Sequence, residues 1–172
     1  MKSIFTTARF TVREYTEADM PEFVNLLTEP EVRLFLPQHS NEKWESIFKE
    51  NLEFYKTNGG FGRWGAVDEG TGKLIGNCML MPAREGLTGF EIGYAFEKPY
   101  WGTGAGTEIT KGLVNYGFGL QKVDLICAIT VMANVPSQKV LLKAGFHASG
   151  TVQLFGSELQ LYRLKSNRIL SC

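Results

Sequence analysis

Apolar and polar residues alternate in several short runs of the chain, with the two-residue period of a β-strand that has one buried face. Strands are predicted on this basis at residues 9–15, 62–68, 73–81, 88–97, 123–130, 146–154 and 159–164. Other stretches repeat their apolar positions every three or four residues, as helices do. Helices are predicted after Thr16 to about Leu27, from about Asn41, from Ile109 to Leu120, and from Asn134 to Gly145. The order predicts a β-rich mixed sheet with helices in two places, an α+β or α/β sandwich.

Local signals set several of these boundaries. Asp19 stands three residues after Thr16, the spacing of a capping box at a helix start. The run from Asp68 to Gly72 predicts a tight turn between two strands. Gly145 suits the residue just after a helix end. Gly93 lies inside a predicted strand, which indicates a bulge or a close approach of another backbone.

Length and charge limit the class of protein. The chain has 172 residues without a linker, repeat or low-complexity tract, so one domain over residues 1–172 is expected. Eighteen Lys and Arg residues balance eighteen Asp and Glu residues, which argues against binding nucleic acid through overall charge. No run approaches the ~18 apolar residues of a membrane span, and the first residues lack a signal peptide's apolar segment. Neither nucleic acid nor a membrane is expected as a partner.

The cysteines and histidines point away from disulfides and metals. Cys78, Cys127 and Cys172 show no paired spacing, so we expect free thiols in a reducing compartment, the cytoplasm. His39 and His147 are the only histidines, and neither is near a cysteine in sequence. No metal site is therefore expected.

A glycine-rich loop, Lys98 to Thr107, connects a predicted strand to a predicted helix. Free backbone N–H groups and the positive end of a helix dipole make such a loop suitable for phosphate. The loop has no lysine before Thr107, so it is not a Walker loop. The glycine spacing is G-x-G-x-G, not the G-x-G-x-x-G of dinucleotide-binding proteins. In those proteins a ribose-binding acid follows the next strand, but Asp124 precedes the predicted strand here. A tight turn that serves only packing remains an alternative.

The run EIGYAFEKPYWGTGAGTEI, followed by NVPSQKVLLKAGF, resembles the GCN5-related N-acetyltransferase (GNAT) family. The likeness is greatest to the branch of the ribosomal-protein N-terminal acetyltransferases, the RimJ/RimL-like proteins. The family's loop is Q/R-x-x-G-x-G/A, and here Trp101 takes the first position. The resemblance implies a GNAT fold, with a central, mixed, mostly antiparallel sheet of about seven strands and helices on both faces. It also implies acetyl-CoA as the acetyl donor and no metal.

In that family a primary amine attacks the thioester of acetyl-CoA directly, without an acyl-enzyme. The resemblance implies that the strand opens near Gly93 and that Asn134 contacts the pantetheine arm, although Asn134 also suits a plain helix cap. Lys143 is expected to reach a CoA phosphate or to be a solvated helix residue. The other expected cofactor contacts are backbone groups of Tyr94, Ala95 and Phe96 and the loop residues Trp101, Gly102, Thr103, Gly104, Ala105, Gly106 and Thr107.

Two residues are expected to move protons. Glu91 is the candidate for accepting the amine's proton, directly or through water. The alternative is that Glu91 is a solvated strand residue without a catalytic role. Ser137 matches the family position whose hydroxyl can bond the CoA sulfur and protonate it. Many relatives use a tyrosine seven residues after the asparagine, but that position is Leu141 here. Ser137 or water must then supply the proton.

The acceptor site is expected around the first helices, the loops near residues 30–40 and 83–88, and the last hairpin. Five apolar side chains could line it as an aromatic wall or belong to the core: Phe35, Leu36, Trp44, Phe54 and Tyr55. The acceptor is expected to be a protein N-terminal amine or a small amine, and a homodimer is possible. The alternatives are an acyl-CoA-binding regulatory module without catalysis and a nucleotide-binding protein. Residues 98–145 carry five lysines against Glu108 and Asp124, so this half is mildly basic and the remainder acidic.

Overall fold

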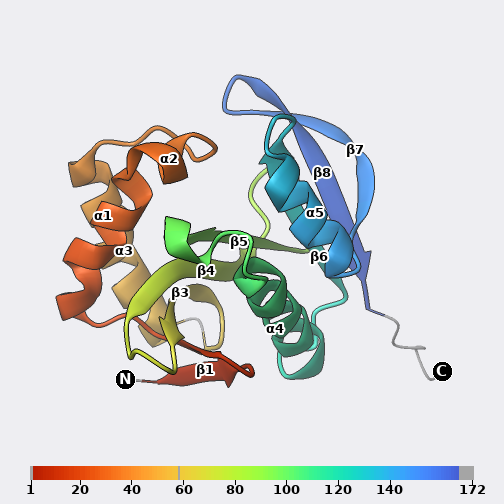
Figure 1. Cartoon of the computed structure of the whole chain (residues 1–172). Helices are drawn as coiled ribbons and strands as arrows, with labels where there is room; N and C mark the ends of the chain where they lie inside the picture. The colour runs from red at the N-terminus through yellow and green to blue at the C-terminus, as the bar shows by residue number, and fades with distance from the viewer. Residues whose placement is uncertain (1, 58, 167–172) are drawn as a thin grey trace.

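The computed structural model describes residues 2–57 and 59–166 and contains one sheet of eight strands in the order β1-β2-β3-β4-β5-β6-β8-β7 (Figure 1). All neighbouring strands are antiparallel except β5 and β6, which are parallel. The strands are β1 (Ser3–Thr6), β2 (Phe10–Arg13), β3 (Gly62–Asp68), β4 (Leu74–Pro82), β5 (Phe90–Phe96), β6 (Leu125–Val131), β7 (His147–Leu154) and β8 (Ser157–Lys165). The predicted mixed, mostly antiparallel sheet is confirmed, with one strand more than expected because β1 was not predicted.

Five α-helices accompany the sheet: α1 (Met20–Thr28), α2 (Pro30–Arg33), α3 (Asn41–Thr57), α4 (Ala105–Gly119) and α5 (Val135–Lys143). Short 3₁₀ turns lie at Glu17–Asp19 and Lys98–Tyr100. The predicted capping box is present, with the backbone N–H of Thr16 2.6 Å from the Asp19 carboxylate. Gly145 has φ +96°, a left-handed conformation that favours glycine, and it follows Ala144, the C-cap of α5, as predicted for a residue just past a helix end.

Helices cover both faces of the sheet, as expected (Figure 1). Side chains on alternate positions of a strand point to opposite faces. Along β5, Ile92 and Phe96 pack in a core with residues of α4 and α5, whereas Ala95 packs with α1, α2 and α3. Trp44 is buried in this second core, so it is a packing residue, while Phe35 remains 39% exposed.

The sheet opens between β5 and β6. These two strands pair only at Phe90 with Ile126 and at Glu91 with Cys127. Beyond these pairs β6 continues its ladder with β8 as far as Val131, and β5 continues its ladder with β4. We call the unpaired region between residues 92–96 of β5 and 128–131 of β6 the β5–β6 gap. Helix α4 supplies the crossover between the two parallel strands.

Candidate active site

One edge of the β5–β6 gap is unpaired backbone. The N–H of Glu97 donates to the carbonyl of Ile75 on β4 at 2.9 Å. Hydrogen-bonded residues alternate along an antiparallel strand, so the backbone groups of Gly93 and Ala95 also point to β4. The backbone groups of Tyr94 and Phe96 therefore point into the gap. The register thus gives the gap a row of backbone donors and acceptors from alternate residues of β5.

The glycine loop begins at the end of this edge. The indole N–H of Trp101 donates to the carbonyl of Phe96 at 2.7 Å, which ties the first loop position to β5. Gly102 and Gly104 have φ +73° and +86°, and Gly104 is the residue at the start of α4. In the described part of the chain no side chain caps this helix start. The first-turn amides of α4 have no acceptor within the helix, so they and the helix dipole are available for an anion.

Helices α4 and α5 approach each other closely beside the loop. A Cβ on Gly106 would lie 3.4 Å from Cγ2 of Val140 on α5, within van der Waals contact. Lys143 follows Val140 by three residues, so it lies on the same side of α5, and it is exposed. Its predicted contact with a phosphate stays a prediction.

Arg9, from the turn between β1 and β2, supports the loop from outside. Its Nε donates to Glu108 at 2.8 Å and its Nη2 to the carbonyl of Thr103 at 3.3 Å. Burial acts to raise the pKa of Glu108, but hydrogen bonds from Thr7 and Arg9 outweigh it and lower the pKa. Sequence reasoning missed Arg9 because it lies far from the loop along the chain.

Tyr94 and Ser137 face each other across the gap. The hydroxyl of Tyr94 lies 2.9 Å from Oγ of Ser137, and Oδ1 of Asn134 accepts from the Ser137 N–H at 3.2 Å. Asn134 therefore caps α5, its expected structural role. Burial raises the pKa of Tyr94 to about 12, while its hydrogen bond with Ser137 acts to lower it. The raised pKa means that the Tyr94 hydroxyl stays neutral. Leu141 is a buried core residue.

Glu91 lies at the closed end of the gap, on the opposite face of the sheet from the Tyr94 side chain. It is 4% exposed and accepts two hydrogen bonds from Arg84, at 2.7 Å and 2.6 Å. It is therefore not a solvated residue, but both of its oxygens are engaged. Arg84 comes from the loop between β4 and β5 and was not among the predicted site residues.

Among the cysteines and histidines that the structure describes, Cys78, Cys127 and His39 pack within the fold. Cys78 and Cys127 are free and buried, and burial raises the pKa of both thiols, that of Cys127 to about 11. Cys172 lies outside the described residues. The ring of His39 packs against that of Trp44, with the ring centroids 4.7 Å apart. Residues 2–57 and 59–166 contain no metal-binding group of His, Cys, Asp and Glu, and no helix there is long and apolar enough to cross a membrane.

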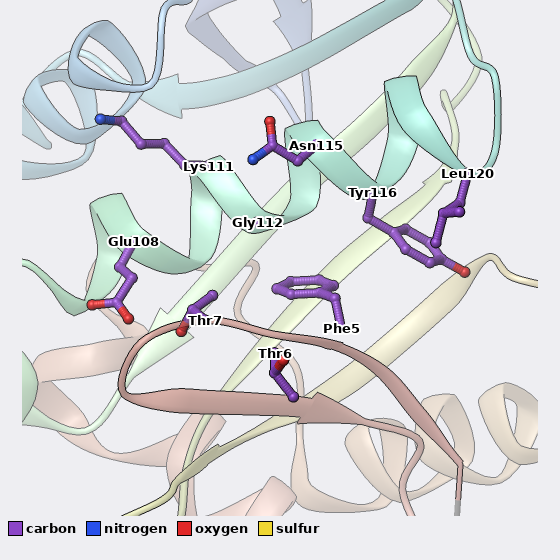
Figure 2. Close-up of a pocket in the computed structure, with 9 residues that line it drawn as sticks. All are labelled: Phe5, Thr6, Thr7, Glu108, Lys111, Gly112, Asn115, Tyr116 and Leu120. Atoms are coloured by element: carbon purple, nitrogen blue, oxygen red, sulfur yellow. The ribbon is translucent and has the colours of Figure 1, made fainter.

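A hollow of about 460 Å³ lies between β1 and α4 (Figure 2). Phe5 from β1 and Tyr116 from α4 line it, with ring centroids 6.0 Å apart, and Glu108 and Lys111 are also among its lining residues. None of the predicted site residues lines it. The hollow is therefore separate from the β5–β6 gap.

Comparison with known proteins agrees with this geometry. A family model described as an acetyltransferase (GNAT) domain matches residues 9–147. The uncharacterized N-acetyltransferase YoaA of Bacillus subtilis is 27% identical over 158 residues, covering 90% of this chain and 89% of that protein. The ribosomal-protein-S5-alanine acetyltransferase of Vibrio fischeri shares the fold, with a TM-score of 0.80, 22% identity, and coverage of 97% and 98%.

A structure of RimL, described as a ribosomal L7/L12 alpha-N-protein acetyltransferase in complex with coenzyme A, also shares the fold. Its TM-score is 0.77 at 15% identity, and the match covers 95% of this chain and 98% of that one. The family model spans most of the chain, including the β5–β6 gap and the glycine loop. The chain belongs to the GNAT family of acetyltransferases.

Proposed function

We propose that this acetyltransferase moves the acetyl group of acetyl-CoA to a primary amine by direct attack of the amine on the thioester. The observation that carries the proposal is the β5–β6 gap, which combines unpaired backbone of β5, the glycine loop at one end and the Tyr94–Ser137 pair across it. An acyl-CoA has a phosphate-rich end and an amide-containing arm, and these match the two parts of the gap.

The loop and β5 would hold the donor. The amides from Gly102 to Thr107 and the start of α4 suit the pyrophosphate, because they combine free N–H groups with the positive end of a helix. The backbone N–H and carbonyl of Tyr94 and the N–H of Phe96 suit the amides of the pantetheine arm, since they face the gap, while the Phe96 carbonyl accepts from Trp101. The backbone N–H and carbonyl of Ala95 point to β4. Any contact of Ala95 with the donor would therefore come from its side chain.

In the reaction the amine nitrogen forms a bond to the acetyl carbon, the carbon–sulfur bond breaks, and the sulfur takes a proton. Ser137 would give that proton and Tyr94 would replace it, a proposal supported by the 2.9 Å between their hydroxyl oxygens. The family resemblance implied a role only for the backbone of Tyr94.

Glu91 would receive the amine's proton through a water molecule. Arg84 engages both carboxylate oxygens, but a carboxylate has about four lone-pair sites, so each oxygen can accept a further hydrogen bond. An α-amino group has a pKa of ~8 and a lysine amine ~10.4, so either must lose a proton before it attacks. Glu91 is the acid residue at the closed end of the gap.

The acceptor is proposed to be a protein N-terminal amine or a small amine. The names of the ribosomal-protein acetyltransferases that share the fold favour the first class. The cytoplasmic location and a homodimer stay predictions. The chain should release CoA thiol when acetyl-CoA is mixed with a panel of amines and N-terminal peptides.

Binding of acetyl-CoA without thiol release from any acceptor would favour the regulatory module instead. Thermal stabilisation by ATP or NAD, but none by CoA, would favour a nucleotide-binding protein. The two measurements together separate the three hypotheses.

A further inference from the structure

The face of the sheet that carries Glu91 also carries two arginines, and Arg84 reaches Glu91 from the β4–β5 loop. Paired residues on neighbouring strands have their side chains on the same face. Glu91 pairs with Cys127, which pairs with Arg163 on β8. On the other side, Arg63 on β3 pairs with Met79, which pairs with Gly93. Arg63 and Arg163 therefore lie on the Glu91 face, on opposite sides of the β5–β6 gap.

These arginines exceed the acid available to them. Glu91 is bound by Arg84 through both of its oxygens. Within the described residues, the side chains of Arg63 and Arg163 make no hydrogen bond or ion pair, and Nε of Arg163 is buried without a partner. Three guanidinium groups against one carboxylate leave an excess of two positive charges on this part of the face.

The excess charge is only partly solvated. Arg63 and Arg163 are each only partly exposed. Burial lowers the pKa of Arg63, the charge of Arg84 lowers it further, and Glu91 acts to raise it. Arg163, Arg84 and Glu91 all act on the pKa of Cys127, so these groups lie around one spot. A half-buried guanidinium without a partner is unfavourable, and an incoming anion relieves that cost.

The position of the cluster relates it to the acceptor. The glycine loop and the Tyr94–Ser137 pair lie on the opposite face, so an acyl donor held by them would not cover the Glu91 side chain. The β4–β5 loop is held against β6, since a Cβ on Gly89 would lie 2.5 Å from the carbonyl oxygen of Leu125. Arg84 also stacks under Phe155 of the β7–β8 turn, 4.9 Å from the ring centroid. Figure 1 shows the β7–β8 hairpin rising beyond β5 and β6 on this edge of the sheet.

We propose that the amine acceptor carries an anionic group, a carboxylate or a phosphate, close to its amine, and that Arg63 and Arg163 bind this group while Arg84 holds Glu91. Guanidinium groups match carboxylate and phosphate oxygens in geometry as well as in charge. The inference rests on the proposed transfer to an amine and specifies the acceptor's class.

Matched acceptor pairs test the preference. We would measure kcat/KM by thiol release for an amino acid against its carboxamide, for an N-terminal Ala-Asp peptide against Ala-Asn, and for phosphoethanolamine against ethanolamine. The charged member of at least one pair should be favoured about tenfold or more, and that pair identifies the anion. Equal or better use of the neutral member in all three pairs would overturn the proposal.

Arginine variants link the preference to the cluster. Arg63→Gln and Arg163→Gln should each reduce the charged-to-neutral ratio about tenfold, and Arg163→Lys should restore part of it. Lys111→Gln, an exposed residue of the hollow on the other side of α4, serves as the control and should leave the ratio unchanged. A ratio unaffected by both arginine variants would also overturn the proposal.

An equilibrium measurement separates this inference from the proposed activity. With CoA present, calorimetric titration should show that N-acetylglycine, N-acetyl-Ala-Asp or N-acetylphosphoethanolamine binds tighter than its neutral counterpart, with the difference reduced in Arg163→Gln. This result without turnover of any amine would support the anion site and count against the enzyme. Turnover of amines without any charge preference would support the enzyme and count against the anion site.

Discussion

Glu91→Gln tests whether this carboxylate accepts the amine's proton or serves only the fold. The glutamine keeps the shape and one acceptor oxygen but removes the negative charge beside Arg84. If Glu91 is the proton acceptor, kcat should fall by about a hundredfold or more, because general base catalysis typically contributes 10²–10⁴-fold. The KM for acetyl-CoA should change little, since Glu91 lies on the other face from the glycine loop.

Glu91→Gln should also lower the free energy of unfolding, by an amount that depends on how buried the Arg84–Glu91 pair is. Breaking a fully buried ion pair costs about 3–5 kcal/mol. The Glu91 side chain is 5% exposed but that of Arg84 is 31% exposed, so water can solvate the remaining guanidinium. We therefore expect a loss of about 2 kcal/mol in the free energy of unfolding, in the range of hydrogen bonds to charged groups. A urea titration of each variant measures this loss.

Asp19→Asn is the matched control. Arg13 binds Asp19 through two hydrogen bonds of 2.8 Å, and the two side chains are 13% and 14% exposed. This pair resembles Arg84–Glu91 in geometry and lies at the start of α1. It should lose similar stability, about 2 kcal/mol, without the fall in kcat.

The pH dependence of the kcat defect gives a second readout. Above pH ~8 an α-amino acceptor is already largely deprotonated, so a missing proton acceptor matters less. The defect of Glu91→Gln should shrink as pH rises. A kcat that falls no further than in Asp19→Asn, or a defect that stays constant with pH, would refute the role of Glu91 as a proton acceptor.

Four further predictions follow from other parts of the structure. Ser137→Ala should lower kcat about a hundredfold with little change in the KM for acetyl-CoA, and an unchanged kcat would remove Ser137 from the proton path. Gly104→Ala should cost ~1–2 kcal/mol, because φ is +86° there, and should raise the KM for acetyl-CoA, as steady-state kinetics would show. Iodoacetamide should label Cys78 and Cys127 only after unfolding, and rapid labelling of the folded protein, followed by mass spectrometry, would contradict their burial. Burial acts to raise the pKa of Asp19, but hydrogen bonds from its partners outweigh it and lower the pKa below its ordinary value of 3.8. The stability that Asp19 contributes is therefore present above about pH 4 and lost as pH falls through the folded pKa. Urea midpoints should then decline less steeply below pH 4 in Asp19→Asn than in the wild type.

The sequence predicted elements that depend on local residues. The capping box at Thr16, the glycine loop, the cap at Asn134 and the left-handed Gly145 each need only a few neighbouring residues, and all four are present. The strand β1 was missed because it is a four-residue edge strand whose residues are all at least partly exposed. Such a strand shows little regular alternation of apolar and polar residues.

Contacts between distant residues were not predictable in this way. The Tyr94–Ser137 contact joins residues 43 positions apart, and that between Arg9 and Thr103 joins residues 94 positions apart. The pattern placed Glu91 and Gly93 on one face of a strand, but which face depends on the strand order and register. Arg84 could have been suspected only from its place in a loop expected near the acceptor.

The β5–β6 gap makes the sheet two ladders joined by only two paired positions. A ligand that occupies the gap with amide groups acts as a missing strand, so it completes the hydrogen bonding of the fold as well as serving as substrate. At a concentration one hundred times its Kd, such a ligand adds ~2.7 kcal/mol to the free energy of unfolding. We expect the amides of Tyr94 and Phe96 to exchange their hydrogens quickly in the free protein and slowly when the gap is filled. Substrate occupancy and folding stability are then linked through the same backbone atoms.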